Sequence, residues 1–196
     1  MTIGFLDVYY KAAGARAACV LAEAWESGSP HSSRVCDIEA VKSYEPGRFY
    51  RRELPCLLSV LRLVPSLPDI VVVDGYVWLS SVGRPGLGAR LYEALGRRIP
   101  VIGIAKTAFQ RAKSCSAVVS VFRGTSRCPL FVTAVDMELE SAGRCVKRMA
   151  GKHRIPEIVR ITDRLSRSGC LQSRDARPGP DGSTRERLST SQVSEE

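Results

Sequence analysis

The chain has 196 residues, of which 44% are hydrophobic and 25% charged. That length suits one compact domain with a sizeable core and is short for two. The longest apolar run, residues 17–22, falls far short of the roughly 20 residues of a membrane helix, and residues 1–4 lack the features of a secretory signal, so we expect neither a membrane-spanning nor an exported protein.

The formal charge is +9, and residues 1–165 carry all of this excess, with 24 basic side chains against 15 acidic ones. Such an excess on a small domain favours a polyanionic partner, although a generally soluble basic surface is the alternative. The seven cysteines are scattered and form no C-x-x-C pair, which argues against a disulfide framework or a zinc site. We expect reduced thiols in a cytoplasmic protein.

The hydrophobic pattern predicts three strands, then a helix, and then alternating strands and helices. Pro55 is expected in the first turn of the first helix, where its missing N–H does no harm. The strands are predicted at 3–11, 15–25, 34–44, 70–73, 100–105, 117–122 and 130–135, and the helices at 52–64, 87–95, 139–149 and 156–165.

This order of elements predicts an α/β fold with a mixed sheet, in which the first three strands are antiparallel and later strands are parallel. Helices are expected on both faces of the sheet. The predicted domain covers residues 1–165. Residues 166–196 hold few apolar side chains among many Ser, Arg, Gly and Pro, so we expect them to form a disordered tail.

Three acidic residues lie within a predicted strand, at the end of a strand or at a helix start. Asp7 lies inside the first apolar strand, Asp74 closes the run of valines 71–73, and Glu53 begins the first helix. If they converge at one edge of the sheet, they suit a hard cation such as Mg²⁺. The alternative for each acid alone is a structural role, as a turn cap, a helix-dipole partner or an ion pair.

Lys106 follows the strand 100–105 and is open to two interpretations. It can extend to solvent along its aliphatic stem, or it can pair with a phosphate as a point charge.

Several segments together resemble one enzyme family, in order over about residues 3–165. They are Asp-Val-Tyr-Tyr at 7–10, Tyr-Glu-Pro-Gly-Arg-Phe-Tyr-Arg-Arg-Glu-Leu-Pro at 44–55, Pro-Asp-Ile-Val-Val-Val-Asp-Gly at 68–75, Pro-Val-Ile-Gly-Ile-Ala-Lys at 100–106, Pro-Leu-Phe-Val at 129–132, Arg-Ile-Pro-Glu at 154–157 and Thr-Asp-Arg-Leu at 162–165. The chain is similar in these stretches to the endonuclease V family of inosine-directed nucleases.

The resemblance implies a ribonuclease-H-like fold and Mg²⁺-dependent cleavage of a nucleic-acid backbone near deaminated adenine, with Mn²⁺ as a second candidate metal. It implies that Asp7, Glu53 and Asp74 are the metal carboxylates and that Lys106 is the active-site lysine. Tyr44 and Pro46 match the segment that wedges into the strand beside the displaced base. Glu45 stands there in place of a more usual apolar or small residue.

Arginines around the wedge segment are candidates for gripping the nucleic-acid backbone, with a solvated basic face as the alternative. These are Arg48, Arg51 and Arg52.

The chain departs from the family pattern at its histidines. Residues 75–86 contain none, and Val135-Asp136 stands where the family has Gly-His. Two outcomes are open: Asp136 serves as a fourth metal ligand, or Tyr76 and Trp78 line a different base pocket and the inosine preference changes. Ordinary packing is the alternative for both aromatic residues.

The sequence therefore predicts a metal-dependent endonuclease that acts on DNA near deoxyinosine in DNA repair, with RNA as a further candidate substrate. We expect a monomer. Two alternatives are a nucleic-acid-binding homologue without catalytic activity and a related nuclease with a different substrate.

Overall fold

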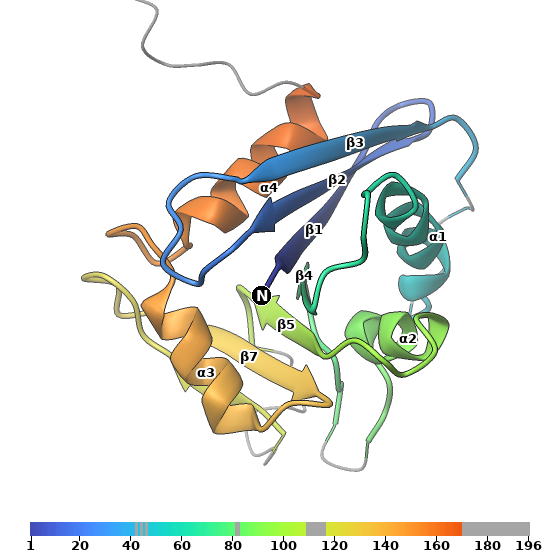
Figure 1. The fold of residues 1–196 in the computed structure, drawn as a ribbon. Coiled ribbons are helices and arrows are strands. Elements are labelled where there is room, and N and C mark those ends of the chain that lie inside the picture. The colour runs from blue at the N-terminus through green and yellow to red at the C-terminus, as the bar shows by residue number, and fades with distance from the viewer. Residues whose placement is uncertain (42, 44, 46, 81–82, 109–116, 170–196) are drawn as a thin grey trace, which may run out of the picture.

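The computed structural model describes residues 1–41, 43, 45, 47–80, 83–108 and 117–169. Seven strands and four helices follow one another in this part of the chain (Figure 1). They are β1 (Ile3–Tyr10), β2 (Ala15–Ala22), β3 (Ser32–Ile38), α1 (Tyr50–Leu61), β4 (Ile70–Asp74), α2 (Leu87–Ala94), β5 (Val101–Ala105), β6 (Val119–Val121), β7 (Leu130–Val135), α3 (Leu139–Arg148) and α4 (Glu157–Ser168).

The strands form one mixed sheet in the order β3-β2-β1-β4-β5-β7-β6. The first three strands pair antiparallel, and β1, β4 and β5 run parallel at the centre. β7 runs antiparallel to β5, and β6 pairs antiparallel with β7 at the far edge. The predicted ribonuclease-H-like class, a mixed sheet with three antiparallel strands first, is confirmed.

Helices cover both faces of the sheet, as the sequence predicts (Figure 1). α1 and α2 pack on one face and α3 and α4 on the other. The central strands β4 and β5 are almost continuously apolar because each buries side chains on both faces. Two hydrophobic clusters, one on each side of the sheet, result from this arrangement.

The first helix begins at Tyr50, two residues before the predicted start. Its first turn is closed by backbone bonds from Arg51 to Arg48 and from Arg52 to Phe49. Pro55 therefore lies inside the helix, where it cannot donate to the carbonyl of Arg51. Glu53 lies in the first turn, as predicted, and its side chain is buried.

The chain that leaves β4 crosses closely over β5. A Cβ atom at Gly103 would lie 2.5 Å from the carbonyl oxygen of Gly75, and Gly75 itself has φ +128°, a conformation that favours glycine. The backbone N–H of Val77 then donates to Thr133 Oγ1 at 2.8 Å. Together these contacts fix the direction in which the chain leaves Asp74.

The last helix continues to Ser168, so the predicted boundary at residue 165 falls inside α4. Gly169 ends it in the left-handed conformation, with φ 73°. The rest of the predicted tail, residues 170–196, lies outside the described residues. Within the described part of the chain, none of the helices is long and apolar enough to cross a membrane.

Candidate active site at the carboxyl edge of the sheet

A cavity of about 580 Å³ opens at the edge of the sheet where β1, β4 and β5 end. Four predicted site residues line it together: Asp7, Glu53, Asp74 and Lys106. Asp7 lies in β1 and Glu53 in α1, Asp74 ends β4, and Lys106 directly follows β5. The parallel arrangement of β1, β4 and β5 explains three of these positions, because parallel strands end at the same edge.

Asp7 and Asp74 lie side by side on neighbouring strands. The parallel register pairs Leu6 with Val73, so the next residue of each strand is one of the two acids. Neighbouring strands are about 4.8 Å apart, which brings the two negative charges close together. Lys106 follows β5 and its Nζ lies 2.6 Å from Asp74 Oδ2.

Glu53 approaches the same cavity from α1. Its side chain is only 6% exposed, and Oε2 is buried without a hydrogen-bond partner among the described residues. Burial, reinforced by the charges of Asp7 and Asp74, raises the pKa of Glu53 to about 9. A carboxyl group in this condition is stabilised by a proton or by a cation beside it.

Asp7 is held from the other face of the sheet. The hydroxyl of Ser166, on α4, donates to Asp7 Oδ2. Burial raises the pKa of Asp7, the hydrogen bond from Ser166 opposes that shift, and the charges of Asp74 and Asp163 add to it. Asp7, which is half-buried, and Glu53, which is buried, both lie beside further negative charge, and the pKa of each is raised.

Lys106 supplies positive charge to this acidic site. Burial lowers the pKa of Lys106, but its hydrogen bond to Asp74 and the surrounding carboxylates outweigh burial, so the pKa is raised overall. Its backbone is held as well: Arg154 Nη2 donates to the carbonyl of Lys106 and, at 2.8 Å, to that of Pro129. The ammonium group therefore has a fixed base from which it reaches into the cavity.

The donor set suits a hard cation, because all the candidate ligands are carboxylates and one buried oxygen has no other described partner. The acids are nonetheless engaged elsewhere, Asp74 by Lys106 and Asp7 by Ser166. Within the described ranges, no three His, Cys, Asp or Glu side chains are close enough together to hold a metal ion. Binding one would require Asp74 to share its charge between Lys106 and the ion.

Asp163, on α4, is a site residue that the sequence reasoning did not single out. It lines the same cavity, and its charge raises the pKa of both Asp7 and Lys106. Arg167 binds both of its oxygens, at 3.0 and 3.1 Å. Asp163 and Ser166 are three residues apart on the helix and so share a face, but this spacing points to the site only once the contact of Ser166 with Asp7 is known.

The predicted wedge residues Tyr44 and Pro46 lie outside the described residues. The arginines that follow them are described and have partners. Arg48 and Arg51 both contact Glu45, at 3.3 and 3.4 Å.

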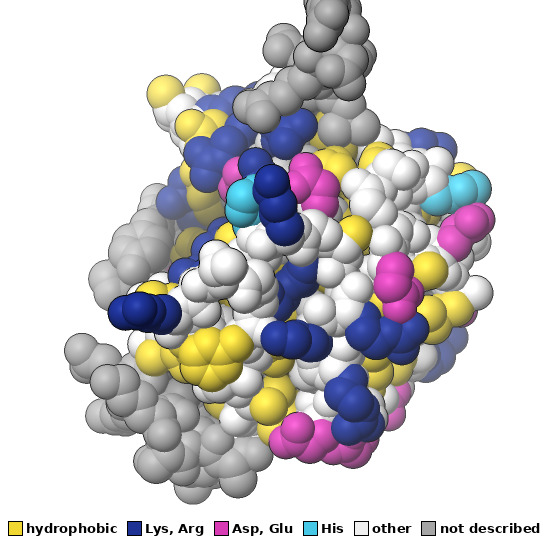
Figure 2. Space-filling view, turned by 90° about the vertical axis from the view of Figure 1, so that its left-hand side faces the viewer, with side chains coloured by type: hydrophobic (Ala, Val, Ile, Leu, Met, Phe, Trp, Pro, Cys, Tyr) yellow, Lys and Arg dark blue, Asp and Glu magenta, His cyan; other side chains and the backbone are white. Residues whose placement is uncertain are grey.

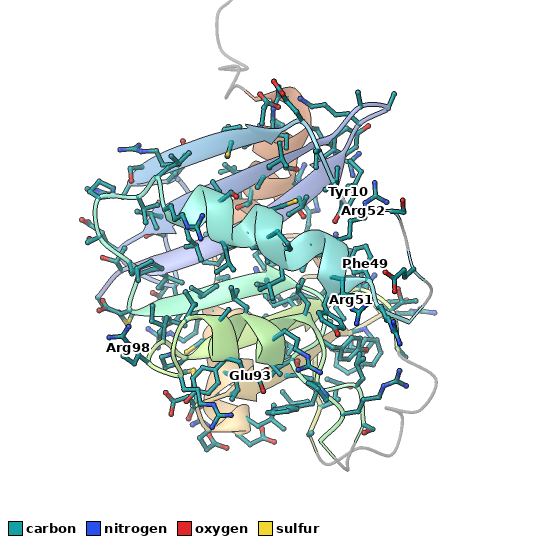
Figure 3. All side chains as sticks on the ribbon, turned by 90° about the vertical axis from the view of Figure 1, so that its right-hand side faces the viewer. Tyr10, Phe49, Arg51, Arg52, Glu93 and Arg98 are labelled. Carbon is teal, nitrogen blue, oxygen red and sulfur yellow. The ribbon has the colours of Figure 1, made fainter. Side chains whose placement is uncertain are left out.

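Arg52 instead stacks over the ring of Tyr10, 3.6 Å from its centroid. Tyr10 also contacts the ring of Phe49 edge-on, and all three side chains lie together at the start of α1 (Figure 3). Arg52 thus packs against the wall of the site.

A second cavity of about 480 Å³ adjoins the first beyond Asp74, and aromatic side chains line it. Tyr76 lines both cavities, and its hydroxyl donates to the carbonyl of Thr107 at 2.8 Å. Phe49, 44% exposed, and Tyr50 form another part of the wall. Trp78 is not among the lining residues; its Nε1 donates to the carbonyl of Ala134 at 3.0 Å, which indicates a packing role.

Asp136 is not a fourth ligand at this site, and that sequence-based alternative is wrong. β7 runs antiparallel to β5, so Val135 pairs with Val101 at the start of β5, whereas Lys106 follows its end. Asp136 therefore lies at the opposite edge of the sheet. There it lies near Tyr92, where desolvation and the charge of Asp136 raise the pKa of the Tyr92 hydroxyl.

A family model and related sequences match this chain, and both point to the same family. A family model described as Endonuclease V matches residues 1–164. The endonuclease V of Azotobacter vinelandii is 31% identical over 183 residues, covering 84% of this chain and 81% of that protein. The endonuclease V of Trichormus variabilis is 28% identical over 142 residues, covering 63% of this chain and 62% of its own.

Solved structures share the fold. The structure of Ciona intestinalis endonuclease V in complex with a 24mer DNA containing an inosine followed by a ribo-adenosine aligns with a TM-score of 0.73. It is 20% identical, and the alignment covers 86% of this chain and 84% of that one. The structure of endonuclease V from Streptomyces avermitilis aligns with a TM-score of 0.67 at 24% identity, covering 86% and 81%.

Proposed function

Because this chain belongs to the endonuclease V family, we propose that it is a divalent-metal-dependent endonuclease that cleaves DNA near deoxyinosine. The resemblance predicted from the sequence motifs is confirmed, and membership supports a nuclease that acts on DNA. The metal requirement, the lesion preference and a role in DNA repair belong to the proposal. A cytoplasmic location and a monomeric state stay predictions.

One observation carries the proposal: Asp7, Glu53, Asp74 and Lys106 line a single cavity, and a buried oxygen of Glu53 has no described partner. The three carboxylates would hold the ion, with Mg²⁺ as the first candidate and Mn²⁺ as the second. When bound, such an ion polarises the scissile phosphate and lowers the pKa of a water nucleophile. Asp163 lies in the same cavity and adds a fourth carboxylate within reach of Lys106.

Lys106 would stabilise the negative charge that develops on the phosphoryl oxygens during cleavage. Its raised pKa keeps the ammonium protonated at neutral pH. Its present partner is Asp74, so an approaching phosphate would compete with that carboxylate for the ammonium. The two carbonyls held by Arg154 fix the backbone while the side chain changes partner.

The aromatic cavity beyond Asp74 would receive an extruded base. Phe49, Tyr50 and Tyr76 line it, and stacking of a base on an aromatic ring is worth about 1–3 kcal/mol. The DNA bound in the Ciona intestinalis relative contains an inosine, which favours that base as the first one to test. RNA that contains inosine is the second substrate to test.

A nucleic-acid-binding protein without catalytic activity is the second candidate. The observation that favours it is the pairing of Asp74 with Lys106, together with the lack of a close three-ligand group among the described side chains. Without a cation, the carboxylates would repel a phosphate, which opposes this alternative.

Cleavage of a labelled inosine-containing strand tests the proposal. The full chain is incubated with DNA or RNA strands in Mg²⁺, Mn²⁺ or EDTA, beside strands in which adenine replaces inosine. We expect metal-dependent cleavage near inosine, lost in Asp74→Ala and kept in Asp69→Ala. Asp69 is a matched control because it stands just before β4, is exposed, and binds the backbone N–H of Thr2.

Three results separate the candidates. Tight binding without cleavage in any metal supports the non-catalytic alternative. Cleavage that ignores inosine supports a nuclease with another substrate. Cleavage that survives Asp74→Ala contradicts the assignment of the site.

A further inference from the structure

A third cavity, of about 430 Å³, continues from the active-site cavity along α4. We call it the α4 groove. The two cavities share Lys106, Asp163 and Arg167, so the groove begins at the proposed catalytic lysine. Arg160 and Arg164 line it further along the helix.

The arginines form a row on one side of α4. Arg160, Arg164 and Arg167 stand at i, i+4 and i+7, a spacing that puts side chains on the same helix face. Lysine and arginine side chains gather towards the upper left in Figure 2, on the side of the molecule that carries α3 and α4. Such a row presents positive charge at regular intervals along the groove.

The nearby acids engage only part of this charge. Glu157 accepts from Arg160 at 2.9 Å and lies 3.9 Å from Arg164, while Asp163 accepts from Arg167. Each guanidinium has five N–H donors, so these contacts leave donors for a ligand. The arginine side chains are 36–57% exposed and can therefore reach one.

The α4 groove differs from the cavity beyond Asp74 in what else lines it. Its remaining lining residues are the aliphatic Ile155 and Val159, whereas Phe49, Tyr50 and Tyr76 line the other. Aromatic walls suit stacked bases, and guanidinium groups without aromatic neighbours suit phosphates. The α4 groove is thus fitted to a backbone rather than to a base.

We propose that the α4 groove binds the sugar–phosphate backbone of the substrate strand on the side of the scissile phosphate away from the base cavity. The inference rests on the proposed function, because it takes the strand to cross the active-site cavity at Lys106. Arg160 and Arg164 are the residues assigned to successive phosphates. The partner is one strand of DNA, recognised by charge and independent of its sequence.

Salt dependence of binding tests this assignment. Anisotropy of a labelled inosine-containing single strand measures Kd for the full chain, in EDTA, from 50 to 400 mM salt. Each phosphate contact on a single strand contributes about 0.7 to the slope of log Kd against log salt. We expect Arg160→Gln/Arg164→Gln to lower the slope by about 1.4 and to weaken binding about tenfold at 100 mM salt.

The matched control is Arg144→Gln/Arg148→Gln. These residues are also four apart on a helix, α3, and each pairs with a glutamate, Glu138 or Glu26. Neither lines any of the three cavities. We expect this variant to keep the wild-type slope, and Arg160→Lys/Arg164→Lys to keep it as well because the charges remain.

An unchanged slope in a folded Arg160→Gln/Arg164→Gln variant overturns the proposal, and so does an equal drop in the α3 control. If the Arg160→Gln/Arg164→Gln variant fails to fold, Arg160→Gln and Arg164→Gln tested singly should each lower the slope by about 0.7. Cleavage by the wild type is scored separately. If the slope falls as expected but the wild-type protein never cleaves, the result supports the α4 groove as a backbone-binding site and contradicts the proposed nuclease activity.

Discussion

The two edges of the sheet both carry an aspartate at the end of an apolar strand, and the two residues have different environments. At the carboxyl edge, Asp74 ends β4 and lies beside Asp7 in a cavity with Glu53. At the opposite edge, Asp136 follows β7 with φ 58° and lies near the hydroxyl of Tyr92, whose pKa its charge helps to raise. In the sequence, Val-Val-Val-Asp and Thr-Ala-Val-Asp are similar patterns.

The number of acids gathered at each edge accounts for the difference. Asp136 meets a neutral hydroxyl at the surface. At the carboxyl edge, three further acidic side chains line the cavity around Asp74, against two basic ones, Lys106 and the Arg167 that pairs with Asp163. An acid at a strand end is thus a functional candidate when the fold adds negative charge to it that local partners do not balance.

The largest expected effect is on catalysis, and it separates the two edges directly. Asp7→Asn should lower kcat/KM on an inosine-containing strand by about 10²–10³-fold, because it removes one of the carboxylates proposed to hold the ion that polarises the scissile phosphate. Asp136→Asn should change it by less than about twofold. Both substitutions keep the side-chain shape, and initial rates in Mg²⁺ measure them.

A large loss in Asp136→Asn would contradict its placement at the opposite edge. An active Asp7→Asn would remove Asp7 from the proposed metal ligands.

The next effect is on stability and depends on pH. The pKa of Glu53 is about 9 when folded and near 4.5 when unfolded, so between these values the folded chain binds more protons. Stability therefore falls as pH rises through this window. Glu53→Gln removes this dependence of stability on pH, because glutamine does not titrate. The variant should be more stable than the wild type by on the order of 2–4 kcal/mol at pH 7.5 in EDTA, and this gain in stability should disappear below pH 4.5.

Urea unfolding of the wild type and of Glu53→Gln, at pH 7.5 and at a pH below 4.5, measures this difference in stability. Glu93→Gln is the control, because Glu93 is exposed on α2 and pairs with Arg90 (Figure 3). A gain in Glu53→Gln that does not change with pH would contradict a buried, protonated Glu53.

A smaller effect is expected from the arginine behind Lys106. Arg154→Met should lower kcat about tenfold, because the backbone of Lys106 loses its donor, and should leave KM within about twofold. Arg34→Met is the matched control, since Arg34 also donates to two backbone carbonyls, those of Leu63 and Ser33, away from the cavity. Equal losses in both variants would indicate general destabilisation.

The smallest effect is expected at the opposite edge. Tyr92→Phe removes the hydroxyl near Asp136 and leaves the ring in place. Activity should stay within about twofold and the unfolding midpoint within about 2 °C, as for most surface changes. A marked loss of activity would show that this edge contributes to the reaction.

Much of the fold could be predicted from the sequence. The valine run before Asp74 and the apolar strand before Lys106 indicated central strands buried on both faces, as observed. The start of α1 was missed by two residues, because backbone bonds of its first turn decide that boundary and Pro55 is tolerated inside the helix.

The site could be predicted only in part. Asp7, Glu53, Asp74 and Lys106 were predicted from strand ends, a helix start and motifs; they line one cavity, and their catalytic roles stay predictions. Asp163 was missed because an acid among arginines on an amphipathic helix looks like an ordinary surface residue. Whether Asp136 is a ligand was left open, because the direction of β7 is not encoded in its own residues but follows from its pairing with β5.

The sequence by itself determined the order of the elements, the family and the chemistry of the candidate residues, because these depend on local periodicity and on motifs along the chain. Only the tertiary structure decided which acids share a cavity, which of them are paired, and that an arginine row continues the site along α4. The reason is that strand direction and helix placement arise from contacts between residues far apart in the chain. Ser166 and Asp7, 159 positions apart, are one such contact.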